Sequence, residues 1–198
     1  MGSRLLLSYL PIMTIVLANG KGGTGKTTLT ILISMALSEA GYRVGVSDKD
    51  PQGTATRWLE EDEGTRVELF NEGEDYDAVL IDTPPQLDSR DLAAALSLAD
   101  RVLIVSSPSP ADLWTSQSTA ELVRQHSKAP AHILFNQVQA GTVLSKGLAD
   151  IAEKLGLPAM ESTIARRQAY QHAVLLGWKA LPGAVREEVF RAALEATK

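Results

Sequence analysis

The feature that most constrains this chain is a glycine-rich loop near its N-terminus. The sequence GKGGTGKT at positions 20–27 matches the pattern G-x-x-x-x-G-K-[ST]. A β-branched apolar run at 14–18 precedes the loop, and an apolar helical pattern begins near Thr28. Because a phosphate-binding loop needs a strand before it and a helix N-terminus after it, this context favours such a loop over an ordinary glycine-rich turn.

The residue types of the loop suit a nucleoside triphosphate. Glycines allow successive backbone N–H groups to converge on phosphate oxygens, and the helix N-terminus adds partial positive charge. We expect Lys26 to reach the β- and γ-phosphates and the Thr27 hydroxyl to bind Mg²⁺. The predicted nucleotide-binding residues of the loop are Gly20, Lys21, Gly22, Gly23, Thr24, Gly25, Lys26, Thr27 and Thr28.

The rest of the chain alternates short apolar runs with segments of helical period. Six runs are typical of strands, at 14–18, 43–48, 66–70, 78–82, 101–106 and 131–137. Runs that are apolar without interruption, such as 102–105, suit strands covered on both faces. The pattern predicts an α/β fold with a doubly wound, mostly parallel sheet and helices on both faces.

Several helix ends are readable in the second half. Ser109 can cap a helix that begins with Pro110 and runs to about His126. A second helix is predicted at 145–155, with Gly156 ending it, and a final helix at 183–198. The strongly acidic segment 60–77 indicates a solvated loop with a short edge strand.

Composition narrows the class of protein. The chain has 198 residues, of which 44% are hydrophobic, and no repeat or linker divides it. We expect one domain at 13–198, preceded by an N-terminal extension at 1–12. No apolar run is long enough to span a bilayer, so the sequence favours a cytoplasmic protein. The absence of cysteine excludes thiolate metal sites and disulfides, and a net charge of -5 restricts any DNA contact to a local surface.

The loop and two later segments resemble the ParA/MinD family of ATPases. The loop has an additional lysine, Lys21, ahead of Lys26, and this lysine matches the deviant Walker A motif of that family. The segment Asp48–Gly53 is similar to the family's D-x-D-P-Q-G sequence, and Asp82–Pro85 to its D-T-P-P sequence. The resemblance implies that ATP is the nucleotide and that Lys21 reaches across a dimer to the partner's nucleotide.

The resemblance also assigns roles to three carboxylates. It implies that Asp48 holds a magnesium-bound water, that Asp50 orients the attacking water, and that Asp82 lies in the outer shell of the metal. Catalysis would then fall to Lys21, Lys26 and Asp50, and the metal site to Thr27, Asp48 and Asp82.

The second half is most similar to small ParA-type partition ATPases of the ParF kind. Ser107–Leu113 and Thr163–Tyr170 resemble segments of those proteins, and Asn136 resembles the residue that reads adenine. Asn136 can also be a turn residue at the end of a strand, and both readings stay open.

The C-terminal region has a small excess of basic residues. Between Met160 and Lys198 there are six bases and four acids. This excess suits contact with DNA phosphates, although a solvated or dimer-contact face explains it as well. The candidate DNA-binding residues are Arg166, Arg167, Lys179, Arg186 and Arg191.

These features together predict a positioning ATPase. The resemblance implies an ATP-bound homodimer that binds DNA non-specifically in the nucleoid, and an activator of the ParB/ParG or cargo-adaptor type. The cargo would be a plasmid, a chromosome or a protein organelle. Two alternatives are a membrane-cycling ATPase similar to MinD and a small-molecule enzyme similar to dethiobiotin synthetase. The first is disfavoured because the C-terminal helix has little apolar bulk, and no stable membrane association is expected.

Trp58, Trp114 and Trp178 are expected in the core or at interfaces.

Overall fold

The computed structural model describes residues 13–62, 64 and 66–198. The predicted N-terminal extension at 1–12 lies outside the described residues. Strands and helices alternate along the chain, as predicted. The elements are β1 (Met13–Ala18), α1 (Lys26–Glu39), β2 (Val44–Asp48), α2 (Thr54–Glu61), β3 (Glu68–Leu69), β4 (Ala78–Asp82), α3 (Arg90–Ser97), β5 (Arg101–Ser106), α4 (Pro110–His126), β6 (Ala131–Phe135), α5 (Val143–Lys146), α6 (Leu148–Lys154), α7 (Ala169–Leu176), the 3₁₀ turn η1 (Trp178–Ala180) and α8 (Gly183–Ala196).

The six strands form one parallel sheet in the order β3-β2-β4-β1-β5-β6. β1 lies in the middle, where Val16 pairs with Ile81 of β4 on one side and with Val102 of β5 on the other. Asp48 and Asp82 are partners in the register of β2 and β4, so both carboxylates lie at the same edge of the sheet. The predicted doubly wound α/β fold is confirmed.

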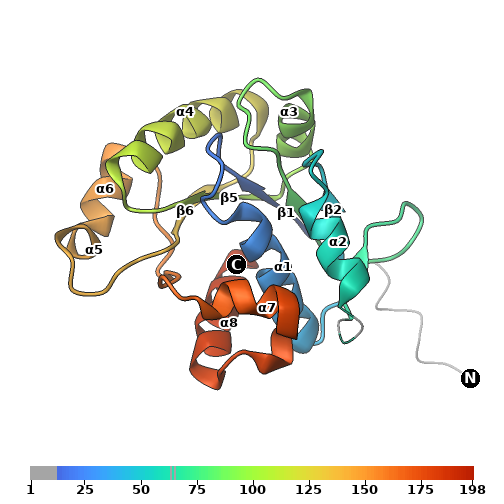
Figure 1. The fold of residues 1–198 in the computed structure, drawn as a ribbon. Coiled ribbons are helices and arrows are strands. Elements are labelled where there is room, and N and C mark those ends of the chain that lie inside the picture. The colour runs from blue at the N-terminus through green and yellow to red at the C-terminus, as the bar shows by residue number, and fades with distance from the viewer. Residues whose placement is uncertain (1–12, 63, 65) are drawn as a thin grey trace, which may run out of the picture.

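Helices cover both faces of the sheet (Figure 1). Successive residues of β1 point to opposite sides, so Ile15 and Leu17 join one core and Val16 and Ala18 the other. α1 and α8 pack in the first core, while α3 and α4 pack in the second. The strands are apolar throughout because both of their faces are buried.

Some predicted boundaries change. The helix predicted at 145–155 is wrong as a single element, because α5 and α6 are separated at Gly147, whose φ of -108° and ψ of 20° are not helical. Gly156 ends α6 with a φ of 63°, as predicted. The edge strand is only Glu68–Leu69, and β6 ends at Phe135 rather than at residue 137.

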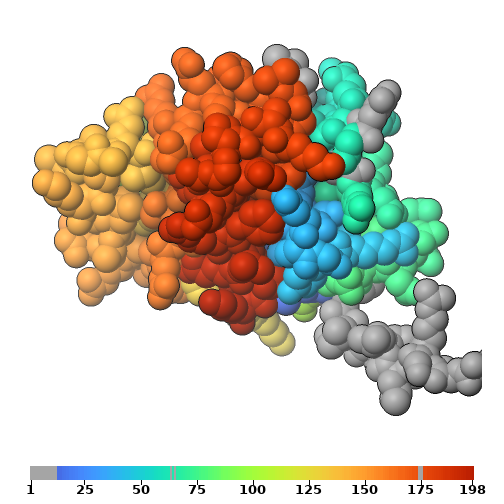
Figure 2. Space-filling view, turned by 90° about the horizontal axis from the view of Figure 1, so that it is seen from below, coloured from blue at the N-terminus to red at the C-terminus, as the bar shows by residue number. Residues whose placement is uncertain are grey.

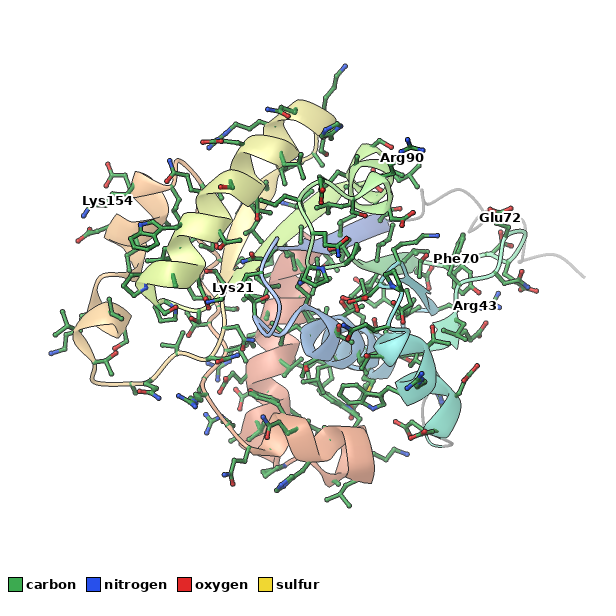
Figure 3. The ribbon with its side chains drawn as sticks, turned by 45° about the horizontal axis from the view of Figure 1, so that its top comes forward. Lys21, Arg43, Phe70, Glu72, Arg90 and Lys154 are labelled. Carbon is green, nitrogen blue, oxygen red and sulfur yellow. The ribbon has the colours of Figure 1, made fainter. Side chains whose placement is uncertain are left out.

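The acidic segment lies at the sheet edge, as predicted. Most of its described side chains are exposed. Arg43, which is labelled in Figure 3, pairs there with Glu68 at 3.0 Å and with Glu74 at 2.9 Å. The segment is therefore a solvated border of the fold.

The three tryptophans differ in environment. Trp58 and Trp178 are buried, as expected. Trp114 on α4 is 73% exposed, so it does not lie in the core, and an interface position for it stays a prediction. Its neighbour Leu113 packs toward α6 instead, since the two side chains point in different directions around the helix.

The C-terminal helix packs against the domain. Val185, Val189 and Ala193 of α8 are buried in the core shared with α1. Figure 2 shows the C-terminal segment, in orange and red, covering this side of the molecule beside α1. Within the described part of the chain, no helix has both the length and the apolar character required to cross a bilayer.

Truncating α8 at its buried face tests this packing. We expect Val189→Ala to lower the free energy of unfolding by about 1.5–3 kcal/mol, because it removes buried methyl groups and leaves a cavity. Leu194→Ala removes a larger but 44% exposed side chain and is expected to cost less. Urea unfolding of both variants checks the order, and an equal loss in the two would contradict the packing of α8.

Candidate nucleotide-binding site

A cavity of about 450 Å³ opens at the carboxyl ends of the strands. This is where ligands bind in open parallel sheets. The glycine-rich loop forms one wall, and segments that are distant in sequence form the others. The lining residues are Gly22, Gly23, Gly25, Lys26, Thr27, Thr28, Leu29, Asp50, Gln52, Thr54, Pro85, Asn136, Gln137, Ala165, Arg166, Arg167, Tyr170 and Gln171.

Lys26 is the buried lysine of the loop. Its side chain lies in the first turn of α1, and its Nζ donates to the Lys21 carbonyl at 3.2 Å. Burial lowers the pKa of the Lys26 ammonium group, while the nearby carboxylates of Asp82 and Asp50 act in the opposite direction. A phosphate chain in the cavity would supply the negative charge that a buried ammonium group needs.

The loop fits ATP and Mg²⁺. The Thr24 hydroxyl oxygen is buried and has no hydrogen-bond partner among the described residues. Such orphaned groups are costly unless a ligand satisfies them. Thr27 donates its hydroxyl to Asp82 at 2.6 Å, which leaves the lone pairs of the Thr27 oxygen for a metal ion. Mg²⁺, when bound, would neutralise charge on the phosphate oxygens.

Asp82 is the deepest carboxylate of the site. It is fully buried at the end of β4, and burial raises its pKa to about 6, with a smaller contribution from Asp48. The hydrogen bond from Thr27 and the charge of Lys26 oppose this shift. The position suits the predicted role in the outer shell of a magnesium ion, which would favour the ionised carboxylate.

Asp48 and Asp50 differ in the number of hydrogen bonds that their carboxylate oxygens accept. Asp48 accepts from the backbone N–H of Asp50 at 3.0 Å, and from the N–H and hydroxyl of Thr56 at 2.9 and 3.2 Å. Asp50 lines the cavity, and one of its oxygens accepts from the Gln52 N–H at 3.0 Å. Its second oxygen accepts no hydrogen bond within the described ranges. Asp50 is therefore the carboxylate that can contact a water in the cavity.

Lys21 lies outside the cavity lining and has a partner that the sequence did not reveal. Its ammonium group pairs with Asp112 in the first turn of α4. Lys21 is labelled in Figure 3. Burial raises the pKa of Asp112, but hydrogen bonds from Lys21 and Ser107 outweigh burial and hold it below its usual value. The sequence identified Asp112 only as an acid at a helix N-terminus. Contact between Lys21 and the nucleotide of a partner subunit stays a prediction.

Asn136 lies where β6 meets the loop. Its amide nitrogen donates to the Thr24 carbonyl at 2.7 Å, and its amide oxygen accepts from the Gln137 N–H at 2.8 Å. A Cβ atom at residue 25 would lie 2.2 Å from this nitrogen, which together with a φ of 98° explains the glycine there. The adenine contact of Asn136 stays a prediction.

The candidate DNA-binding residues do not form one unpaired basic patch. Arg167 pairs with Glu188 at 2.8 Å, Arg186 with Glu39 at 3.4 Å, and Arg191 with Glu187 at 2.6 Å. Arg166 lines the nucleotide cavity, and Lys179 is exposed in η1. Their contact with DNA stays a prediction.

The CobQ/CobB/MinD/ParA nucleotide binding domain matches residues 15–177. This range contains the loop, the three carboxylates and Asn136. The chain belongs to this family. The predicted relationship to ParA and MinD is therefore confirmed, and nucleotide binding is the shared property that the family's description gives.

Two relatives that match over most of their length have the same name. The maintenance of carboxysome distribution protein A of Halothiobacillus neapolitanus is 32% identical over 183 residues, which cover 83% of this chain and 84% of that protein. The protein of the same name from Gloeobacter kilaueensis is 33% identical over 186 residues, which cover 86% and 83%. ParA of Rhizobium radiobacter is 25% identical, with 79% of each chain covered.

Solved structures agree with the fold. An ATP complex of McdA from Cyanothece has a TM-score of 0.80 at 18% identity and covers 94% of this chain and 96% of that chain. MinD in its complex with MinC from Aquifex aeolicus has a TM-score of 0.79 at 19% identity, with 93% and 96% covered. Cobyrinic acid a,c-diamide synthase from Mycobacterium smegmatis, solved with an ATP analogue and magnesium, has a TM-score of 0.63 at 22% identity, with 85% and 96% covered. ATP and Mg²⁺, the predicted cofactors, are thus confirmed for the family.

The buried Asp82 predicts a pH dependence of stability in the protein free of nucleotide and metal. Since its pKa is raised to about 6, the folded state binds more protons than the unfolded chain between about pH 4 and 6, so stability falls as pH rises through this range. Asp82→Asn removes this fall, and the variant should gain up to about 3 kcal/mol relative to wild type at pH 7. Urea unfolding from pH 4 to 7 with a chelator measures it.

The exposed carboxylate of Asp88 provides the matched control. Asp88→Asn is expected to follow the wild-type profile over the same pH range. A profile of Asp82→Asn that runs parallel to wild type would contradict a raised pKa for Asp82.

Proposed function

We propose that this chain is a ParA-type ATPase that positions a cargo. It binds MgATP, forms a homodimer in the ATP state, and holds DNA without sequence preference. A partner protein of the ParB/ParG or cargo-adaptor type stimulates hydrolysis and thereby releases the dimer from DNA. The two relatives named for carboxysome distribution support a protein organelle as the class of cargo.

The different placement of the two loop lysines is the observation that carries this proposal. Lys26 is buried at the cavity, where it serves the chain's own nucleotide. The Lys21 side chain is 41% exposed and pairs with Asp112. Because its ammonium group is partly exposed, Lys21 can leave Asp112 for the phosphates of a nucleotide in a second subunit, while the Ser107 hydroxyl continues to donate to Asp112.

Hydrolysis in this proposal depends on Asp50 and Lys26. The free oxygen of Asp50 orients a water toward the γ-phosphate, as a water-positioning residue does in phosphoryl transfer. Lys26 and the N–H groups of the loop stabilise the charge that develops on the phosphate oxygens. ATP hydrolysis is slow until a partner protein completes the site. The lifetime of the ATP-bound state then determines how long the protein stays on DNA.

The alternatives have less support. A membrane-cycling ATPase would need a free apolar helix face, whereas Val185, Val189 and Ala193 of α8 are buried. A small-molecule enzyme is represented in the family by the diamide synthase structure, but its TM-score of 0.63 is below the 0.80 of McdA. ATP turnover stimulated only by a small organic molecule would favour that alternative.

Separate substitutions of the two lysines test the proposed dimer. We expect Lys26→Ala to weaken MgATP binding at least tenfold, since a buried charge-assisted contact is lost. Lys21→Ala should bind MgATP within about twofold of wild type but remain monomeric in sedimentation experiments, because only the contact across the dimer is lost. Lys49→Ala, an exposed lysine outside the cavity lining, is the control and should dimerise normally. Dimerisation of Lys21→Ala with MgATP would contradict the role of Lys21.

Retention on random-sequence DNA tests the DNA-binding state. We expect Asp50→Ala to bind MgATP without hydrolysing it, and therefore to be retained with MgATP but not with MgADP. Retention should fall steeply between about 50 and 200 mM salt, since phosphate contacts release counterions. Asp75→Ala, in the acidic edge segment, is the control and should hydrolyse ATP as wild type does. Absence of retention at low salt, or normal hydrolysis by Asp50→Ala, would refute this part of the proposal.

A further inference from the structure

Two side chains at the end of β6 contact the glycine-rich loop. The Asn136 amide nitrogen donates to the Thr24 carbonyl at 2.7 Å, and the Gln137 amide nitrogen donates to the Gly23 carbonyl at 3.0 Å. The partners are separated by 112 and 114 positions in the sequence. Two successive carbonyl groups of the loop are thus held toward β6.

The planarity of the peptide bond gives these contacts a consequence. In a trans peptide the C=O and N–H groups point in opposite directions. The Gly23 carbonyl shares a peptide plane with the Thr24 N–H, and the Thr24 carbonyl shares one with the Gly25 N–H. Both N–H groups therefore point away from β6, and neither donates to an acceptor among the described residues. Unpaired, neighbouring N–H groups of this kind bind anions.

The backbone of Gln137 supports a specific role for its side chain. Gln137 has a φ of 56°, and no other described residue except glycine has a positive φ. Asn136 stabilises this conformation, because its amide oxygen accepts the Gln137 N–H at 2.8 Å. Backbone strain of this kind persists where the surrounding structure needs the side chain in one place. Here it directs the Gln137 amide to the Gly23 carbonyl.

We propose that Asn136 and Gln137 are positioning residues that fix two peptide planes of the loop in their phosphate-binding orientation before a nucleotide arrives. The inference rests on the loop as the nucleotide site and deepens its description. The pair acts on the phosphate chain through the loop, so its effect on affinity is independent of the base. A direct contact to the base would instead change the affinity only for nucleotides that carry that base.

Three ligands distinguish the two roles. The affinities of wild type and variants are measured by calorimetry for MgADP, MgGDP and magnesium tripolyphosphate, which has no base. We expect Gln137→Gly to weaken all three by the same factor, about 3- to 10-fold, as for one lost hydrogen bond. Gln139→Ala, an exposed residue two positions later, is the control and should bind all three ligands as wild type does.

A stability measurement separates positioning from folding. Because glycine tolerates a positive φ, Gln137→Gly is expected to keep the wild-type melting temperature while its affinities fall. Asn136→Ala should show the same base-independent loss in affinity. A loss confined to MgADP would assign these residues to base recognition, and unchanged affinities for all three ligands would refute any positioning role. Failure of wild type to bind any of the ligands would instead contradict the proposed function.

Discussion

The structure around the site depends on keeping the Thr24 and Gly25 N–H groups of the glycine-rich loop without acceptors among the described residues. Unsatisfied backbone groups are costly, so the surrounding structure must hold such a loop open. Its first residues are fixed from α4, where Thr119 accepts the Gly20 N–H at 3.1 Å, and from Asn19, which accepts the Lys21 N–H at 2.9 Å. Its last residues are fixed from β6. Because β1 lies in the middle of the sheet, the loop that follows it can contact both α4 and the end of β6.

Charge at the cavity follows from the same arrangement. Parallel strands bring Asp48, Asp50 and Asp82 to one edge of the sheet, next to the single buried cation Lys26 within the described ranges. Burial raises the pKa of Asp82, and the other two carboxylates add to the shift, so Lys26 and the Thr27 hydroxyl offset the repulsion at the site only in part. A divalent cation would relieve it, while the phosphate chain would supply the counter-charge for Lys26. Nucleotide and metal are thus expected to bind together.

The sequence predicted the parts of this structure that local patterns determine. Continuous apolar runs identified the strands because their residues are buried on both faces. Glycine spacing identified the loop because a backbone that wraps around phosphate groups needs glycine at those positions. The pairs Lys21–Asp112, Gln137–Gly23 and Asn136–Thr24 could not be predicted, since they join residues 91 to 114 positions apart. The helical period continues across Gly147, so the pattern does not mark the break there. The exposure of Trp114 goes with the packing of Leu113 toward α6, which periodicity does not reveal.

The ion pairs of the C-terminal region bear on how a chain of net charge -5 would hold DNA. Arg167, Arg186 and Arg191 each have an acidic partner, yet at least one side chain of every pair is more than 40% exposed. Such pairs contribute about 0–1 kcal/mol, so DNA phosphates can compete for the arginines at low cost. One subunit would then offer only weak binding. The proposed dimer would double the number of phosphate contacts on one DNA molecule, and the second set would bind at the high effective concentration set by the first. In that proposed ATP-bound dimer, the dependence of DNA binding on the nucleotide would follow from dimerisation, without any rearrangement of the basic surface.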